Sequence, residues 1–175
     1  PWLDLQISDL PALLGGFAIN PLAAAIIVTV KCLLKLPFTS TACVGELADL
    51  VVGLAFVLPA SLFYKKVHDK KGAVIGMGIG TVCATLVAVL ANRFALIPFY
   101  ALQFGNGDAE KGMSVLVNAV SSLYKNATTG TFYGFYLWLA VVPFNLLRCL
   151  LSSTVTFFVY KPLSKYLHWE AKRDK

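Results

Sequence analysis

The stretch AVIGMGIGTVCATLVAVLA, residues 73–91, decides the fold because it holds no charged side chain. At about 1.5 Å per residue, a helix of this length nearly crosses the roughly 30 Å hydrocarbon core of a bilayer. Residues 51–64 and 144–160 are similar runs, interrupted only by Arg148. The chain has 175 residues, 58% of them hydrophobic and 14% charged, and a mean hydropathy of +0.72. We therefore expect an all-α fold, a polytopic membrane helical bundle that forms one domain over residues 1–175.

The basic residues are concentrated in two places. Nine of the fifteen lie either in one short loop or after the last apolar run, namely Lys65, Lys66, Lys70, Lys71, Lys161, Lys165, Lys172, Arg173 and Lys175. Membrane proteins concentrate Lys and Arg on the cytoplasmic side, so the net charge of +6 does not indicate nucleic-acid binding. We expect the loop and the C-terminus to be cytoplasmic, beside the lipid bilayer.

The apolar segments predict spans at about 8–19, 22–36, 44–64, 73–98 and 131–160. We expect a break in the last span at Pro143. Residues 101–130 are predicted to form an outer loop that contains a helix at about 109–124. The first two predicted spans leave an alternative open. Asn20-Pro21 can end one short span and start another, or it can kink a single span over 8–36. A hairpin gives five spans, an outer start and one more helix expected before Pro1. A kinked span gives four spans, with both ends of the chain on the cytoplasmic side.

Small residues recur every four positions from Gly72, at Gly76, Gly80, Ala84 and Ala88. Small residues at this spacing let two helices approach closely. We expect the row to pack against another helix of this chain, and the alternative is the docking of a separate subunit.

The motifs of common enzymes are absent from the sequence. Its two histidines lack metal-ligand spacing, and no GxSxG, HExxH or Cys/His cluster occurs. Gly107 and Gly112 have the spacing of a phosphate-binding loop, but Met113-Ser114 stands where Lys and Ser or Thr are required. We expect a protein that is not an enzyme, holds no metal or cofactor, and relies on partners for any ATP hydrolysis.

Arg148 lies just inside the last apolar run, where a cation costs several kcal/mol unless it faces a partner, a cavity or the interface. Asn145 points the same way because it lies three residues earlier. Asn92 and Arg93 are predicted at the same outer end, and aromatic residues such as Tyr100 and Phe135 lie near them in the sequence. Amides and arginines beside aromatic surface suit a small polar or anionic organic molecule.

Several stretches, in order and over nearly the whole chain, resemble the substrate-binding S component of energy-coupling factor (ECF) vitamin importers, in the riboflavin and pantothenate branch. They are Leu5–Ala12, Asn20–Ala23, Val44–Asp49, Val57–Ala60, Ala91–Arg93, Leu96–Tyr100 and Pro143–Arg148. The resemblance implies six helices in a bacterial cell membrane, a cytoplasmic Asn20-Pro21 hairpin and a vitamin site at the outer side. It also implies a transmembrane coupling subunit and two ATPases as partners.

The resemblance also bears on the vitamin. Asn92, Asn145 and Arg148 match positions that resemble flavin contacts in riboflavin binders, with Arg93 in place of the usual Tyr and Arg148 in place of the usual Lys. Arginine grips a carboxylate in a fork. Two arginines near one pocket therefore give a slight preference for pantothenate, which carries a carboxylate, over riboflavin, which does not.

Two other functions are compatible with the residues. A stand-alone secondary transporter could couple ions through Glu46 and Asp49, which lie three apart at the outer start of a span. A structural membrane subunit without a ligand could pair Arg148 with an acid such as Glu46.

Overall fold

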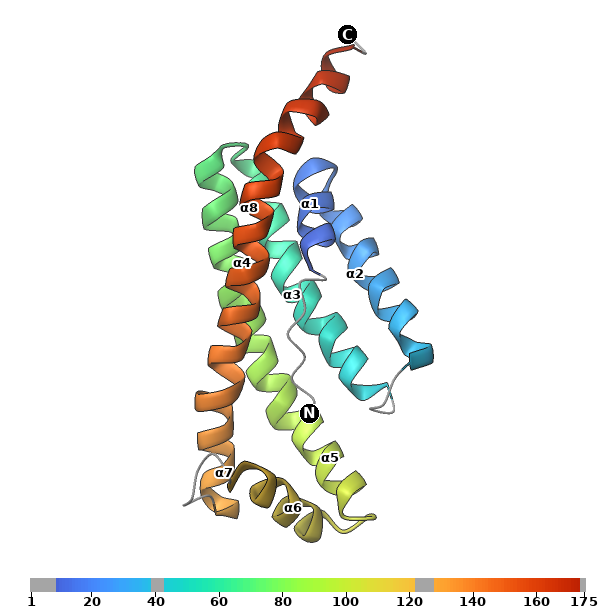
Figure 1. Ribbon diagram of the computed structural model, residues 1–175, viewed down its shortest axis with the longest axis vertical. Coiled ribbons are helices and arrows are strands. Elements are labelled where there is room, and N and C mark those ends of the chain that lie inside the picture. The colour runs from blue at the N-terminus through green and yellow to red at the C-terminus, as the bar shows by residue number, and fades with distance from the viewer. Residues whose placement is uncertain (1–8, 39–42, 122–127, 174–175) are drawn as a thin grey trace.

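The computed structural model describes residues 9–38, 43–121 and 128–173, with side chains described as far as Tyr160. The described chain is a bundle of helices (Figure 1). In order they are α1 (Leu10–Ala18), α2 (Pro21–Lys35), the 3-10 turn η1 (Leu36–Phe38), α3 (Val44–Lys66), α4 (Lys70–Ala91), the π-helical turn η2 (Asn92–Leu96), α5 (Ile97–Phe104), α6 (Ala109–Ser121), α7 (Thr129–Tyr136), the π-helical turn η3 (Leu137–Val141) and α8 (Val142–Arg173).

Three continuous helices are long and apolar enough to cross a membrane: Val44–Lys66, Lys70–Phe104 and Thr129–Tyr160. Large apolar side chains such as Leu86 and Leu150 are exposed on these helices. Such surfaces suit contact with acyl chains rather than water. The fold class expected from the sequence, an all-helical membrane bundle, is confirmed.

The Asn20-Pro21 junction separates two helices rather than kinking one. α1 and α2 pack side by side as a hairpin (Figure 1). Asn20 has an extended backbone, and its side-chain oxygen accepts a hydrogen bond of 2.8 Å from the backbone N–H of Ala23. Pro21 fits the first helical position because the N–H that it lacks would have no partner there.

Replacing Asn20 with alanine should destabilise the chain by about 1 kcal/mol, because the first turn of α2 loses its side-chain cap. Thermal unfolding of the purified chain in detergent measures the effect. Asn20→Asp, which keeps a capping oxygen, should behave like the wild type. Equal losses in both variants would contradict a capping role.

The small-residue row of α4 is buried, and its middle part packs against α3 of the same chain. Its members Gly72, Gly76, Gly80, Ala84 and Ala88 are all buried. A Cβ atom on Gly76 would stand 2.7 Å from the carbonyl oxygen of Ala60, and one on Gly80 would overlap the carbonyl oxygen of Phe56. The α3 and α4 backbones therefore touch at Gly76 and Gly80, which leaves no room at these two positions for a separate subunit.

A π-helical turn precedes a proline in each of the two longest continuous helices, Lys70–Phe104 and Thr129–Tyr160. η2 ends two residues before Pro98, and η3 ends two residues before Pro143. A proline ring clashes with the carbonyl four residues earlier in an α-helix, and a π turn is wider there. The chain therefore stays helical from Thr129 through Pro143, and the predicted break at Pro143 is wrong.

The two ends of the bundle differ. α6 lies across one end, beyond the last turns of α5 (Figure 1). Its first turn is capped by Asp108, whose Oδ1 accepts hydrogen bonds from the backbone N–H groups of Lys111 and Glu110. These bonds and the Lys111 ammonium, 3.2 Å from Oδ2, lower the pKa of Asp108. The α1–α2 turn, the basic α3–α4 loop and the end of α8 lie at the opposite end.

Candidate functional site

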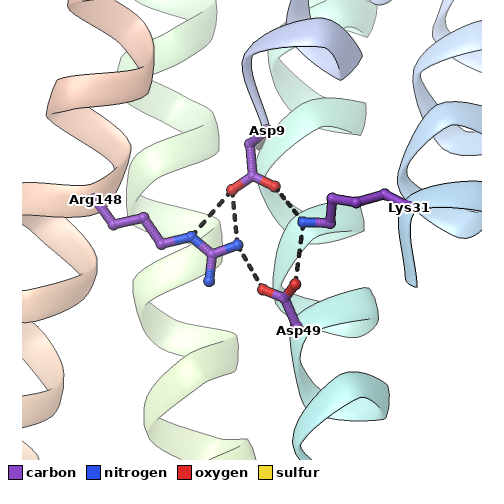
Figure 2. Close-up of polar contacts among 4 residues, drawn as sticks. All are labelled: Asp9, Lys31, Asp49 and Arg148. Carbon is purple, nitrogen blue, oxygen red and sulfur yellow. Dashed lines mark hydrogen bonds and ion pairs between the residues drawn. The ribbon is translucent and has the colours of Figure 1, made fainter. Parts of the chain in front are cut away.

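Four charged side chains meet between the helices, each from a different segment (Figure 2). Asp9 lies just before α1, Lys31 near the end of α2, Asp49 in the second turn of α3, and Arg148 in the second turn of α8. We call these four residues the charge cluster. The shortest separation in sequence between Arg148 and its acidic partners spans 99 residues, so the cluster fixes segments that are remote along the chain.

Arg148 is held mainly by Asp9. Its Nε and Nη2 donate to Asp9 Oδ2 at 3.1 and 2.8 Å, and Nη2 also donates to Asp49 Oδ1 at 2.5 Å. Lys31 closes the ring, with its Nζ 2.8 Å from Asp9 Oδ1 and 3.0 Å from Asp49 Oδ2. The remaining guanidinium nitrogen, Nη1, contacts none of the three other side chains drawn in Figure 2.

The cluster is buried and electrically balanced. The side chains of Asp9, Arg148, Asp49 and Lys31 are 2%, 8%, 10% and 13% exposed. Two carboxylates and two cations sum to zero, which is the condition under which charges are tolerated away from water. Removing any one member would leave a net charge in a site that has lost most of its hydration.

From the sequence we expected the Arg148 guanidinium to face a bound polar molecule, whereas the structure pairs it with two acids of the chain itself. The expected partner of an internally paired arginine was Glu46, whereas the partners are Asp9 and Asp49. The sequence did contain a sign of this pairing. Lys31 and Asp49 are charged residues inside predicted spans, and charged residues within a membrane pair with one another. Asp9 was harder to find because it stands at the edge of its apolar segment.

Asn92 and Asn145 are both buried; Asn92 is the first residue of η2, and Asn145 lies in the first turn of α8, just after η3. Their side-chain amides donate to the carbonyl oxygens four residues earlier, Asn92 to Ala88 at 2.8 Å and Asn145 to Val141 at 2.9 Å. Asn92 Oδ1 is buried and has no hydrogen-bond partner among the described residues. A buried acceptor without a donor is costly, and a bound molecule could supply that donor.

Arg93 does not join the charge cluster. It is exposed, and its guanidinium lies over the rings of Tyr133 and Phe94, at 5.5 and 5.7 Å from their centroids. The two arginines that the sequence placed near one pocket therefore have different surroundings. The cation–π contact between Arg93 of η2 and Tyr133 of α7 joins these two segments.

Aromatic side chains gather beyond η2 and η3. Tyr100 is buried and stacks on Phe104 with 5.9 Å between ring centroids. Phe132 and Tyr136 of α7 stack at 5.4 Å, and Phe135 of the same helix is half-buried. These rings lie at the end of the bundle where α6 is found, beside buried aliphatic side chains such as Ile97 and Leu116.

The two acids of the ion-coupling hypothesis face different surroundings. Asp49 belongs to the charge cluster, whereas Glu46 lines an apolar pocket of about 230 Å³ between α2 and α3. Among the described residues, no group of three or more His, Cys, Asp or Glu side chains is arranged to hold a metal ion.

The described helices thus form a small multi-span membrane bundle with a buried cluster of charged side chains between its spans. The model of the family "ECF transporter, substrate-specific component" matches residues 1–160. The chain belongs to this family, as its resemblance predicted, and the family consists of transporter components rather than enzymes.

Similar proteins agree with this assignment. The riboflavin transporter RibU of Staphylococcus aureus is 29% identical over 167 residues, which cover 95% of this chain and 78% of that protein. RibU of Streptococcus thermophilus is 29% identical over 169 residues, covering 95% and 71%. A solved structure described as the S component of a bacterial ECF transporter has a TM-score of 0.67 and 27% identity, and the match covers 95% of this chain and 81% of that one.

Proposed function

We propose that this chain binds riboflavin as the substrate-specific component of an ECF importer, with the vitamin held between the outer halves of the two long helices. The structural observation that carries the choice of this vitamin is that Asp9 and Asp49 already neutralise Arg148. The relatives that match nearly the whole chain are named riboflavin transporters. Riboflavin carries no charge at neutral pH and suits a site whose own charges cancel.

Pantothenate fits the same geometry less well. The slight preference for it depended on two guanidinium groups that could grip a carboxylate. Arg148 already donates to two carboxylates, and Arg93 is exposed on aromatic rings. An anion that entered this site would compete with Asp9 or Asp49 or add an uncompensated negative charge.

The residues proposed to hold the vitamin offer complementary polar groups. One edge of the flavin ring carries one N–H donor between two carbonyl acceptors. Asn92 Oδ1 accepts from such a donor, and Arg148 Nη1 and the Asn145 side chain lie on the same face of α8 as candidates for the carbonyls. Tyr100 and Phe135 supply aromatic surface for the apolar part of the ring.

Titration of the purified chain with riboflavin, followed by quenching of flavin fluorescence, and with pantothenate, followed by calorimetry, tests the substrate. We expect tight binding of riboflavin and none of pantothenate in the same concentration range. Binding of pantothenate with no response to riboflavin would reject the proposal.

Asn92→Ala should weaken riboflavin binding by about 1–3 kcal/mol, because a buried hydrogen bond to the ring edge is lost. The fluorescence titration measures the change. Leu90→Ala, on an exposed part of the same helix, is the matched control and should bind as the wild type does. An unchanged affinity in Asn92→Ala would remove Asn92 from the site.

The proposal includes the partners and the orientation. A transmembrane coupling subunit and two ATPases would drive uptake, with the basic α3–α4 loop and the C-terminus in the cytoplasm. ATP-dependent riboflavin uptake in liposomes that contain the whole complex is expected. Uptake by the lone chain that an uncoupler abolishes would instead support an ion-driven transporter.

A further inference from the structure

The anion-binding position of the charge cluster is filled by the protein itself. Lys31 Nζ and Arg148 Nη2 both contact the Asp49 carboxylate, one at each oxygen. Two cations that converge on a carboxylate are the arrangement by which proteins recognise anionic ligands. Here the carboxylate is tethered to α3, at a local concentration that a free anion cannot match.

Asp9 and Asp49 have different roles in this arrangement. Asp9 is 2% exposed, and its Oδ2 accepts hydrogen bonds from both Nε and Nη2 of Arg148. Asp9 therefore orients the guanidinium from the interior of the bundle. Asp49 is the more exposed of the two, at 10%, and accepts one hydrogen bond from Arg148, at Oδ1, where Asp9 accepts two. Of the two acids, Asp49 is the one that an incoming anion could replace with the smaller loss.

We propose that Asp49 is a specificity-determining residue: its carboxylate occupies the anion position between Lys31 and Arg148 and thereby excludes anionic nutrients from the site. This inference deepens the proposed function and depends on it for the identity of the neutral ligand. Without the Asp49 charge, the cluster keeps one carboxylate against two cations and gains an affinity for anions.

The first test changes the selectivity. Asp49→Asn keeps the size of the side chain and removes its charge. The full-length variant and the wild type are titrated with riboflavin and with pantothenate as the anionic probe. We expect the affinity for pantothenate relative to riboflavin to rise by roughly tenfold or more in the variant. Glu46→Gln, one turn away and outside the cluster, should leave the ratio unchanged. An unchanged ratio in Asp49→Asn would overturn the inference.

The second test does not depend on the vitamin. Asp49→Ala empties the position, and formate is small enough to enter it. The melting temperature of this variant should rise with formate concentration and saturate, while that of the wild type in the same salt should not. If Asp49→Ala is recovered poorly, formate during purification should restore its yield. No effect of formate on either quantity would overturn the inference, whereas failure of riboflavin binding alone would overturn the proposed function.

Discussion

Arg148→Met should lower the free energy of unfolding by about 3–5 kcal/mol, the range measured when one partner of a buried ion pair is removed. The variant leaves two carboxylates facing Lys31 alone, in a site where each of the four side chains is 13% exposed or less. Methionine fills much of the volume of the arginine stem, so the loss reports charge more than a cavity. Unfolding of the purified chain in detergent, followed by helical circular dichroism, measures the effect.

Two further variants separate charge from packing. Arg148→Lys keeps the positive charge but loses the paired N–H donors of the guanidinium. Its free energy of unfolding should therefore fall by less than that of Arg148→Met. Adding Asp9→Asn to Arg148→Met rebalances the cluster as one cation and one carboxylate and should recover part of the stability. If the double variant is no more stable than Arg148→Met alone, charge balance is not what stabilises the cluster.

Gly80→Val should destabilise the chain by about 3 kcal/mol or prevent its recovery in folded form. A Cβ atom on Gly80 would overlap the Phe56 carbonyl oxygen and press against the Phe56 ring, and neither the backbone of α3 nor a buried ring can yield easily. The α3–α4 contact would have to open along its length. Thermal unfolding and the elution volume of the detergent-solubilised chain give the result.

Gly78 provides a matched control two residues away. It is exposed on the same helix, and a Cβ atom added there meets nothing within 4 Å. Gly78→Val should change the free energy of unfolding by no more than about 0.5 kcal/mol. Equal losses in Gly78→Val and Gly80→Val would show that helix propensity, and not the close approach of α3, determines the cost.

Features that depend on local periodicity could be predicted from the sequence. The long apolar runs gave the three longest helices, and the four-residue spacing from Gly72 gave the face that packs most closely. The break between α1 and α2 at Asn20-Pro21 follows from capping chemistry that acts within one turn.

Features that depend on remote contacts could not be predicted. Arg148 and Asp9 are separated by 139 positions, and no spacing rule relates them. Glu46 and Asp49 are equivalent as sequence signals, but only Asp49 belongs to the charge cluster. Pro143 was misread because a local rule predicts a break, while the wider turn of η3 accommodates the ring.

The π-helical turns η2 and η3 contact each other across the bundle, and each has one more residue than an α-helical turn needs. A homologue that lacked one residue in 92–96 would rotate everything beyond that point by about 100° around the helix axis. Such a homologue would turn the counterpart of Tyr100 away from the bundle interior. A single-residue gap at either turn therefore signals a different set of side chains facing the bundle interior, and alignments of this family should preserve such gaps.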